Sequence, residues 1–467
     1  MTIVRKIKRK RKRIKRTFSI IKKSNLDVFN KIFRILSWLL PGLVLKRWIV
    51  TSAIGLVTSL LGIAIWTNLR PLYWLIETFF WLMTGLTSIF PVSILGPFIL
   101  FIGLLLICLG QNRSINSIQK ALVPQKETLL VDALRVNSKL SRGPNIVAIG
   151  GGTGLSTLLK GLKNYSSNIS AIVTVTDDGG SSGILRKQLG VQPPGDIRNC
   201  LAALSNEEPT LTRLFQYRFS GGGGLEGHSF GNLFLSALTT ITGSLEKAVQ
   251  ASSQVLSVQG QVIPATGIDV MLWAELEDGE KIFGESLIGK SVKPISRIGC
   301  LPENPPALKN AIEAIKEADL IVLGPGSLYT SLLPNLLVPE IVEELLKNNS
   351  PKIYISNLMT QPGETDGLDV YQHIKSIEKQ LFNFGVNTRI FNAILSQGEF
   401  EGSSLIDYYR SRGAEPVICN KKRLVSEGYH VLQAPLYSKR ITPTLRHDYR
   451  RLARAVMYLY KKIKKAS

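Results

Sequence analysis

Short continuous apolar runs alternate with amphipathic stretches through the second two thirds of the chain. The first clear unit begins at residues 146–149, which are apolar and mostly β-branched, as in a buried parallel strand. Four glycines and a threonine follow within residues 150–154. Apolar residues then recur at helical spacing, at Leu155, Leu158, Leu159 and Leu162. This pattern predicts a strand, a tight glycine turn and a helix.

The same alternation continues to about residue 438 and predicts an α/β fold. Further strands are expected at 170–176, 319–323, 352–358 and 391–395, with helices at about 305–318, 337–347, 369–382 and 404–412. Residues 260–300 differ, because short alternating runs flank Glu277-Asp278-Gly279, which is a hairpin signal. We therefore expect a mostly parallel sheet with a small β-rich insertion.

The N-terminal region has a different pattern, because two long runs carry no charge. Residues 48–66 lie between Arg47 and Arg70, and a second run extends from Thr78 to Gly110. The first run is long enough to cross a bilayer. We predict two transmembrane helices, at about 48–67 and 90–110, and prefer them to a cleaved secretory signal because the basic region before them is too long.

Basic residues concentrate at the two ends of the chain and account for its net charge of +23, while the body is nearly neutral. The positive-inside rule then places both termini in the cytoplasm of a multi-pass inner-membrane protein. We expect the basic arm to contact anionic lipids and expect no nucleic-acid partner, since no RNA-binding pattern accompanies the charge. The predicted segments are a cytoplasmic arm (1–47), a membrane region (48–110), a connector (111–144), a nucleotide-binding domain (145–438) and a basic C-terminal helix (439–467).

The glycine turn is the first candidate site. Backbone N–H groups of Gly151, Gly152, Thr153 and Gly154 can approach an anion closely, and the following helix directs its positive end at the same place. A tight turn without a ligand is the alternative. A dinucleotide fingerprint needs a third glycine where Leu155 stands, so NAD-dependent oxidoreduction is the weakest functional hypothesis.

Two carboxylates, Asp177 and Asp178, follow the second strand and are expected beside the glycine turn. They could bind ribose hydroxyls or a Mg²⁺ ion carried by a diphosphate, or one of them could cap the next helix. Ser181 and Ser182 lie in the adjoining glycine-serine run, which offers a second anion-binding loop or a mobile surface loop.

Two polar pairs at helix starts extend the candidate site. Asp196 and Asn199 are three residues apart and share one helix face, although either could be only a cap. His228 and Asn232 are one turn apart, and a structural role for this pair is as plausible as ligand contact.

Two later strands also end in polar turns. Gly326, Ser327 and Tyr329 follow the strand at 319–323, and Thr360 follows the strand at 352–358. Core packing is the alternative role of Tyr329. Because parallel strands end at one edge of the sheet, all these residues are expected to converge there.

The four cysteines, Cys108, Cys200, Cys300 and Cys419, are far apart and form no C-x-x-C motif. We expect them to be reduced thiols. The four histidines give little support for a zinc site.

Six motifs, taken in order, resemble the family that contains YvcK-type gluconeogenesis factors and CofD-type 2-phospho-L-lactate transferases. The resemblance covers about 145–438 and rests on Gly150-Gly-Gly-Thr-Gly154, Thr176-Asp-Asp-Gly-Gly-Ser-Ser-Gly183, Pro194-Gly-Asp-Ile-Arg-Asn199, Gly227-His-Ser-Phe-Gly-Asn232, Gly324-Pro-Gly-Ser-Leu-Tyr-Thr330 and Met359-Thr-Gln-Pro-Gly-Glu-Thr365. The motifs are closer to the YvcK type.

The resemblance implies a Rossmann-like fold and a nucleotide-type ligand. Its leading implication is a membrane-tethered regulator of cell shape, envelope and carbon metabolism that binds a UDP-sugar. The alternative is a Mg²⁺-dependent phosphotransferase that moves a phospholactyl-type group from a nucleoside diphosphate carrier, with Asp177 and Asp178 as metal ligands. No catalytic residue and no obligatory cofactor follow from the sequence, and self-association is left open.

Overall fold

The computed structural model describes residues 45–466 except 67–69, 90, 92, 95, 107–109, 111–137, 207–208, 292, 401–403 and 439–443. The chain divides into two compact units, Met1–Ser138 and Lys139–Ser467. Each unit is described by itself.

The first unit contains the helices α2 (Leu45–Trp66) and α3 (Arg70–Ile89). Among the described residues, no helix combines the length and apolar character that a membrane crossing requires. The predicted multi-pass membrane location is therefore wrong, and the described residues do not support the two predicted spans. Helix α2 begins at Leu45, before the predicted first span, and α3 includes Glu77 and occupies the segment expected to separate the spans. Nearly all of the predicted basic arm lies outside the described residues.

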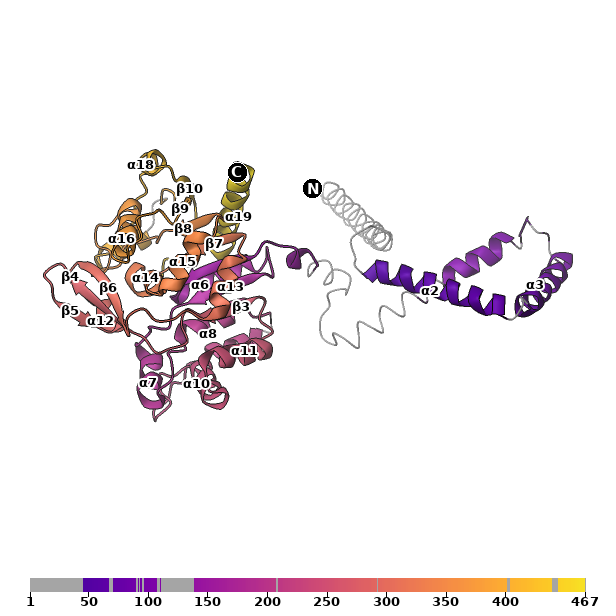
Figure 1. The fold of residues 1–467 in the computed structure, drawn as a ribbon, viewed down its shortest axis with the longest axis horizontal. Coiled ribbons are helices and arrows are strands. Elements are labelled where there is room, and N and C mark those ends of the chain that lie inside the picture. The colour runs from indigo at the N-terminus through magenta and orange to yellow at the C-terminus, as the bar shows by residue number, and fades with distance from the viewer. Residues whose placement is uncertain are drawn as a thin grey trace, which may run out of the picture. The chain divides into compact units, whose positions relative to one another are not determined.

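A seven-stranded parallel sheet forms the centre of the second unit (Figure 1). In spatial order its strands are β10 (His430–Ala434), β9 (Ala393–Gln397), β8 (Lys352–Ile355), β7 (Leu320–Leu323), β1 (Ile146–Gly150), β2 (Ile169–Val173) and β3 (Gln261–Pro264). The chain runs outward from β1 to β3 on one side and from β7 to β10 on the other. The order therefore reverses between β1 and β7, which confirms the expected Rossmann-like fold.

Alternation along the strands produces two hydrophobic cores, one on each face of the sheet. In β1, Ile146 and Ala148 join one core while Val147 and Ile149 join the other. The first core is covered mainly by α6 (Gly152–Leu162), α8 (Gly195–Leu204), α9 (Pro209–Gln216), α10 (Phe230–Thr242), α11 (Leu245–Val255) and α19 (Tyr449–Ala466). The second is covered by α13 (Lys309–Lys316), η1 (Leu328–Leu332), α14 (Leu333–Leu336), α15 (Pro339–Lys347), α16 (Val370–Phe382) and α18 (Lys421–Ser426). The helices α7 (Gly180–Leu189) and α17 (Ser404–Arg410) also belong to this unit.

The basic C-terminal helix α19 is part of the first core. Its apolar side buries Leu452, Val456 and Ile463, while its lysines from Lys461 onward are exposed. It packs against α6 at Gly161, where a side-chain carbon would overlap the carbonyl oxygen of Tyr449. Glycine is therefore required for the close approach of these two helices.

The segment predicted to be β-rich contributes to two sheets. Its first strand, β3, belongs to the parallel sheet, whereas β4 (Met271–Leu276), β5 (Lys281–Phe283) and β6 (Ile295–Leu301) form an antiparallel sheet in the order β5-β4-β6. Helix α12 (Glu285–Ile288) connects β5 to β6.

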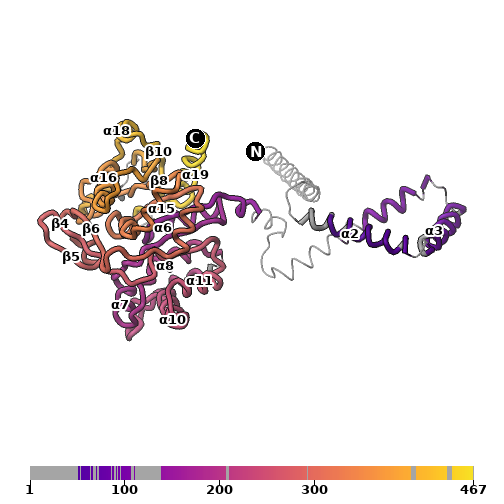
Figure 2. Tube along the Cα trace, in the orientation of Figure 1, coloured from indigo at the N-terminus to yellow at the C-terminus, as the bar shows by residue number. Residues whose placement is uncertain are grey.

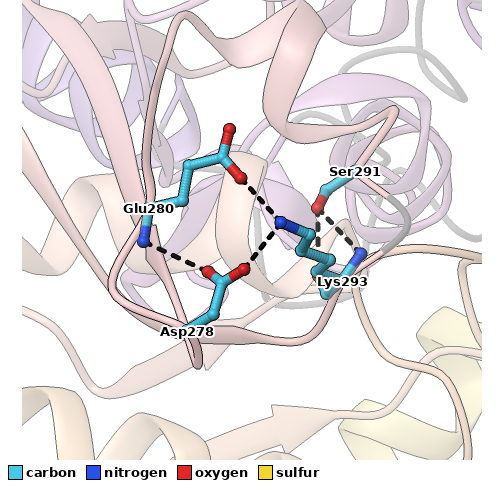
Figure 3. Close-up of polar contacts among 4 residues, drawn as sticks. All are labelled: Asp278, Glu280, Ser291 and Lys293. Atoms are coloured by element: carbon cyan, nitrogen blue, oxygen red, sulfur yellow. Dashed lines mark hydrogen bonds and ion pairs between the residues drawn. The ribbon is translucent and has the colours of Figure 1, made fainter.

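An ion-pair cluster joins the β4–β5 turn to the segment before β6. The ammonium group of Lys293 lies 2.6 Å from a carboxylate oxygen of Asp278 and 2.8 Å from one of Glu280 (Figure 3). The hydroxyl of Ser291 accepts a hydrogen bond from the backbone N–H of Lys293. All three charged groups are exposed, so the cluster orients this segment more than it stabilises the fold.

Candidate nucleotide-binding crevice

The glycine turn after β1 lies at the point where the strand order reverses. Gly152 adopts a φ of +65°, which glycine tolerates without strain. A side-chain carbon at Gly154 would overlap the carbonyl oxygen of Pro325 in the turn after β7. A side-chain carbon at Gly151 would lie 2.5 Å from a carboxylate oxygen of Asp196. Glycine thus lets the turns after β1 and β7 and the start of α8 meet, and Thr153 is exposed beside them.

Asp196 extends from the first turn of α8 toward the start of α6, where its carboxylate accepts a hydrogen bond from the Gly152 N–H. Burial and the nearby charge of Asp177 raise the pKa of Asp196 to about 6, and the Gly152 hydrogen bond opposes this increase. A protein carboxylate therefore already lies at the helix start where the sequence suggested an anionic ligand.

Asp177 and Asp178 are adjacent in sequence but have different partners. One oxygen of Asp177 accepts the N–H of Gly179 at 3.0 Å, and its other oxygen lies close to Gly195 at the start of α8. Asp178 accepts the N–H of Ser286 at 2.7 Å and thereby caps α12. Asp177 thus belongs to the crevice beside Asp196, whereas Asp178 attaches the insertion to the parallel sheet.

The second predicted loop forms a buried polar network. Ser181 at the start of α7 accepts a hydrogen bond from the Asn232 amide and shares another with Nδ1 of His228, both at 3.0 Å. The same amide lies 3.5 Å from the hydroxyl of Ser182. α7 and α10 lie side by side and bring these residues together (Figure 2). The sequence motifs around Ser181 and His228 therefore meet in space.

Arg198 is the main cation in the crevice, and the sequence analysis did not select it. Its guanidinium donates to the side chain of Asn199 at 2.9 Å and to the Ser229 hydroxyl. Burial lowers its pKa, while the negative charges of Asp177 and Asp196 raise it. Arg198 lies within the Pro194–Asn199 motif, close in sequence to the selected residue Asp196. This position could have identified Arg198 as a candidate site residue.

The remaining predicted residues have partners of their own. Ser327, next to Gly326, accepts a hydrogen bond from Gln361 at 2.7 Å. The Thr360 hydroxyl accepts the N–H of Glu415 at 2.8 Å. Tyr329 is buried, and its hydroxyl donates to the Ile295 carbonyl oxygen at 3.4 Å. Ser327 stays at the sheet edge, whereas the hydroxyls of Thr360 and Tyr329 hold loops together.

Two further acidic side chains with raised pKa values lie near these acids, and neither was selected from the sequence as a site residue. Burial and the charges of Asp177 and Asp178 raise the pKa of Glu285 to about 8. Burial raises the pKa of Glu364 to about 7. Glu285 follows no strand of the parallel sheet, so its sequence position gave no reason to select it, whereas Glu364 lies within the motif at 359–365, which was the available signal.

A resident metal site is not formed by these acids. Within the described residues, no group of three or more His, Cys, Asp or Glu side chains is arranged to hold a metal ion. Mg²⁺ usually needs only one or two carboxylates when a ligand supplies phosphates. Asp177 and Asp196 fit that role better than the predicted pair, because Asp178 is engaged by α12. The described cysteines, Cys200, Cys300 and Cys419, are free.

Comparisons with known proteins agree with this architecture. The family model described as 2-phospho-L-lactate transferase CofD matches residues 146–437. A Nostoc sp. protein named "Putative gluconeogenesis factor" is 50% identical over 91% of this chain and 92% of its own. The gluconeogenesis factor of Bacillus subtilis is 45% identical over 69% of this chain and all of its own.

Solved structures show the same fold. A crystal structure of a Bacillus halodurans protein, described as a member of the UPF0052 family, is 44% identical and superposes with a TM-score of 0.64. The match covers 68% of this chain and 99% of that protein.

Proposed function

Since the chain belongs to the CofD family and is similar over most of its length to gluconeogenesis factors, we propose that its crevice binds a nucleotide sugar. Ligand binding would serve regulation of carbon metabolism and of the cell envelope. The observation that carries the proposal is the contact between the glycine turns after β1 and β7, where Gly154 meets Pro325. Ligands of open α/β sheets bind at this point.

The crevice supplies groups suited to a diphosphate and a ribose. The starts of α6 and α7 present backbone N–H groups, and Arg198 offers a half-buried positive charge. Asp177 and Asn199 provide oxygen atoms for ribose hydroxyls. Asp196 would be near the phosphates, so its protonated form favours binding of an anion.

The test compares Gly152→Val with a matched variant, Gly222→Val. Both glycines have positive φ, of 65° and 79°, so the two variants share the backbone strain. Only Gly152 lies in the crevice, where the added side chain would occupy ligand space. Isothermal titration with UDP-N-acetylglucosamine, GDP and NAD should show binding of the UDP-sugar to the wild type and to Gly222→Val, and no binding to Gly152→Val.

Thermal unfolding gives a second readout of the same proposal. Ligand at 100 times its dissociation constant adds about 2.7 kcal/mol to the unfolding free energy. If none of the three nucleotides shifts the transition of the folded wild type, the proposed function is wrong. If NAD alone shifts it, the crevice is a dinucleotide site and the regulatory proposal fails.

One observation favours a second candidate, a Mg²⁺-dependent transferase that uses a nucleoside diphosphate carrier. Burial is the main cause of the raised pKa of Asp196, and the nearby negative charge of Asp177 is the second. A Mg²⁺ ion brought by the diphosphate would relieve the repulsion between these two carboxylates. This candidate predicts that GDP stabilises the protein only with Mg²⁺ and that Asp177→Asn abolishes the Mg²⁺ dependence.

A further inference from the structure

A second cavity lies outside the crevice, between the antiparallel sheet and the end of α16. Its volume is about 240 Å³, and its lining includes Trp273, Arg297, Glu303, Asn304, Asn383 and Phe384. An engineered cavity of about 150 Å³ holds benzene, so this volume suits a ligand of roughly ten non-hydrogen atoms. Such a ligand has the size of a single sugar ring.

An aromatic ring is fixed in one wall of this cavity. Trp273 in β4 pairs with Gly299 in β6, and a side-chain carbon at Gly299 would lie 2.5 Å from Cε2 of the indole. The indole therefore lies directly against the backbone of Gly299. The Lys281 ammonium is 4.9 Å from the ring centroid and restrains the ring further.

Lys281 is the cation nearest the ring, but it does not line the cavity. The cation that does line it, Arg297, is already neutralised. The Arg297 guanidinium is 5.5 Å from the Trp273 centroid and donates to the Glu275 carboxylate at 2.7 Å. The other charged group of the lining is the carboxylate of Glu303. The cavity therefore lacks an uncompensated cation for a phosphate, which distinguishes it from the crevice.

Several hydrogen-bonding groups around the ring are not used by the fold. Among the described residues, none bonds the Trp273 indole N–H or the side chains of Glu303, Asn304 and Asn383. Asn304 has a φ of 52°, a conformation that asparagine tolerates better than most residues. Amide and carboxylate groups can donate to and accept from several hydroxyls at once.

We propose that this cavity, which we call the Trp273 pocket, binds a neutral sugar ring. The apolar C–H face of the sugar packs on the indole, and its hydroxyls bond Glu303, Asn304 and Asn383. Phe384, which is 43% exposed, provides a second apolar contact. The pocket is separate from the crevice, and the proposal does not depend on the nucleotide ligand.

Tryptophan fluorescence of the full chain tests the proposal. Of the six tryptophans, only Trp273 follows residue 81, so the difference between the wild type and Trp273→Phe isolates its signal. We expect glucose, galactose or N-acetylglucosamine to change this signal saturably, and cyclohexanol to leave it unchanged. No saturable change with any of the three sugars, or an equal response to cyclohexanol, would overturn the proposal.

Two variants locate the binding site. Asn383→Ala removes an exposed amide beyond α16 and should lower sugar affinity at least about tenfold without changing the melting temperature. Gly152→Val should leave sugar binding unchanged. Loss of sugar binding in Gly152→Val with normal binding in Asn383→Ala would place the sugar in the crevice and refute the Trp273 pocket.

Discussion

Two glycine-rich segments of the second unit have similar composition but opposite surroundings. Residues 150–154 are enclosed, so that an added side-chain carbon at Gly151 would meet Asp196 and one at Gly154 would meet Pro325. Residues 221–224 are exposed, and no heavy atom lies within 4 Å of an added carbon at any of these four glycines. One segment needs glycine for space, and the other needs it at most for backbone conformation.

The difference shows that a glycine run acquires its role from the elements that flank it. The enclosed segment follows a buried strand and begins a helix, so three loops converge on it. The exposed segment connects α9 to α10 and meets no other loop. Substitutions in the two segments should therefore differ in their effects by several kilocalories per mole.

Gly154→Ala should have the largest effect. The new methyl group would overlap the Pro325 carbonyl oxygen. This oxygen belongs to the backbone and cannot rotate away as the end of a flexible side chain can. We expect a loss of about 3 kcal/mol or more in unfolding free energy, at the upper end of overpacking costs. Urea unfolding followed by far-UV circular dichroism measures it. An unchanged midpoint would show that the enclosed segment is looser than described.

Asp196→Asn should change the pH dependence of stability. The pKa of Asp196 is about 6 in the folded protein and 3.8 in the unfolded chain, so the folded state binds more protons. Stability therefore falls as pH rises from about 4 to 6, by on the order of 2–3 kcal/mol. The variant side chain does not ionise, so the unfolding free energy of the variant does not fall in this way. The variant should therefore be more stable than the wild type at pH 8.

Melting temperatures measured from pH 4 to pH 8 test that prediction. The difference between Asp196→Asn and the wild type should disappear near pH 4, where the wild-type carboxyl is protonated in both states. Asp269→Asn is a suitable control, because Asp269 is an exposed carboxylate that pairs with Arg186. A variant less stable than the wild type at pH 8 would contradict the proposed cost of ionising Asp196.

Gly222→Ala should cost about 1 kcal/mol. Its φ of 79° is a left-handed conformation that disfavours a side chain, although nothing obstructs the methyl group. The measurement is the same urea midpoint. A cost equal to that of Gly154→Ala would remove the distinction between the two glycine segments.

Gly224→Ala should have the smallest effect. This residue lacks the positive φ of its neighbours, and the space around it is open. Restricting the unfolded chain should stabilise the protein by about 0.5 kcal/mol. A clear destabilisation in the urea series would indicate that the exposed segment contacts another group in solution.

The arrangement of the parallel sheet could be predicted because its signals are local. The apolar run at 146–149, the glycines and the leucine spacing all lie within one strand–turn–helix unit, and the structure reproduces it as β1 and α6. The membrane prediction failed because uncharged runs do not by themselves produce a helix with the length and apolar character of a span. The prediction placed the segment around Glu77 between two spans, whereas the structure includes it in the helix α3.

The site could be predicted only in part, because neighbours in sequence can have distant partners. Nothing near Asp178 indicates that its carboxylate caps a helix beginning at Glu285. The same is true of Thr360, whose partner is Glu415. By contrast, Ser181 and His228 could each be selected from the motif that contains it. Their contact at 3.0 Å could not be predicted, because only the tertiary fold brings the two motifs together.

The contact between Gly161 and Tyr449 has a consequence for synthesis of the chain. Helix α6 begins at the crevice and is covered by α19, which follows it in sequence after every strand of the parallel sheet. A nascent chain on the ribosome cannot complete the first core until α19 has left the exit tunnel. The crevice therefore acquires its full support only once residues 449–466 have been synthesised, and a product that stops before Tyr449 exposes the apolar side of α6 to quality-control proteases.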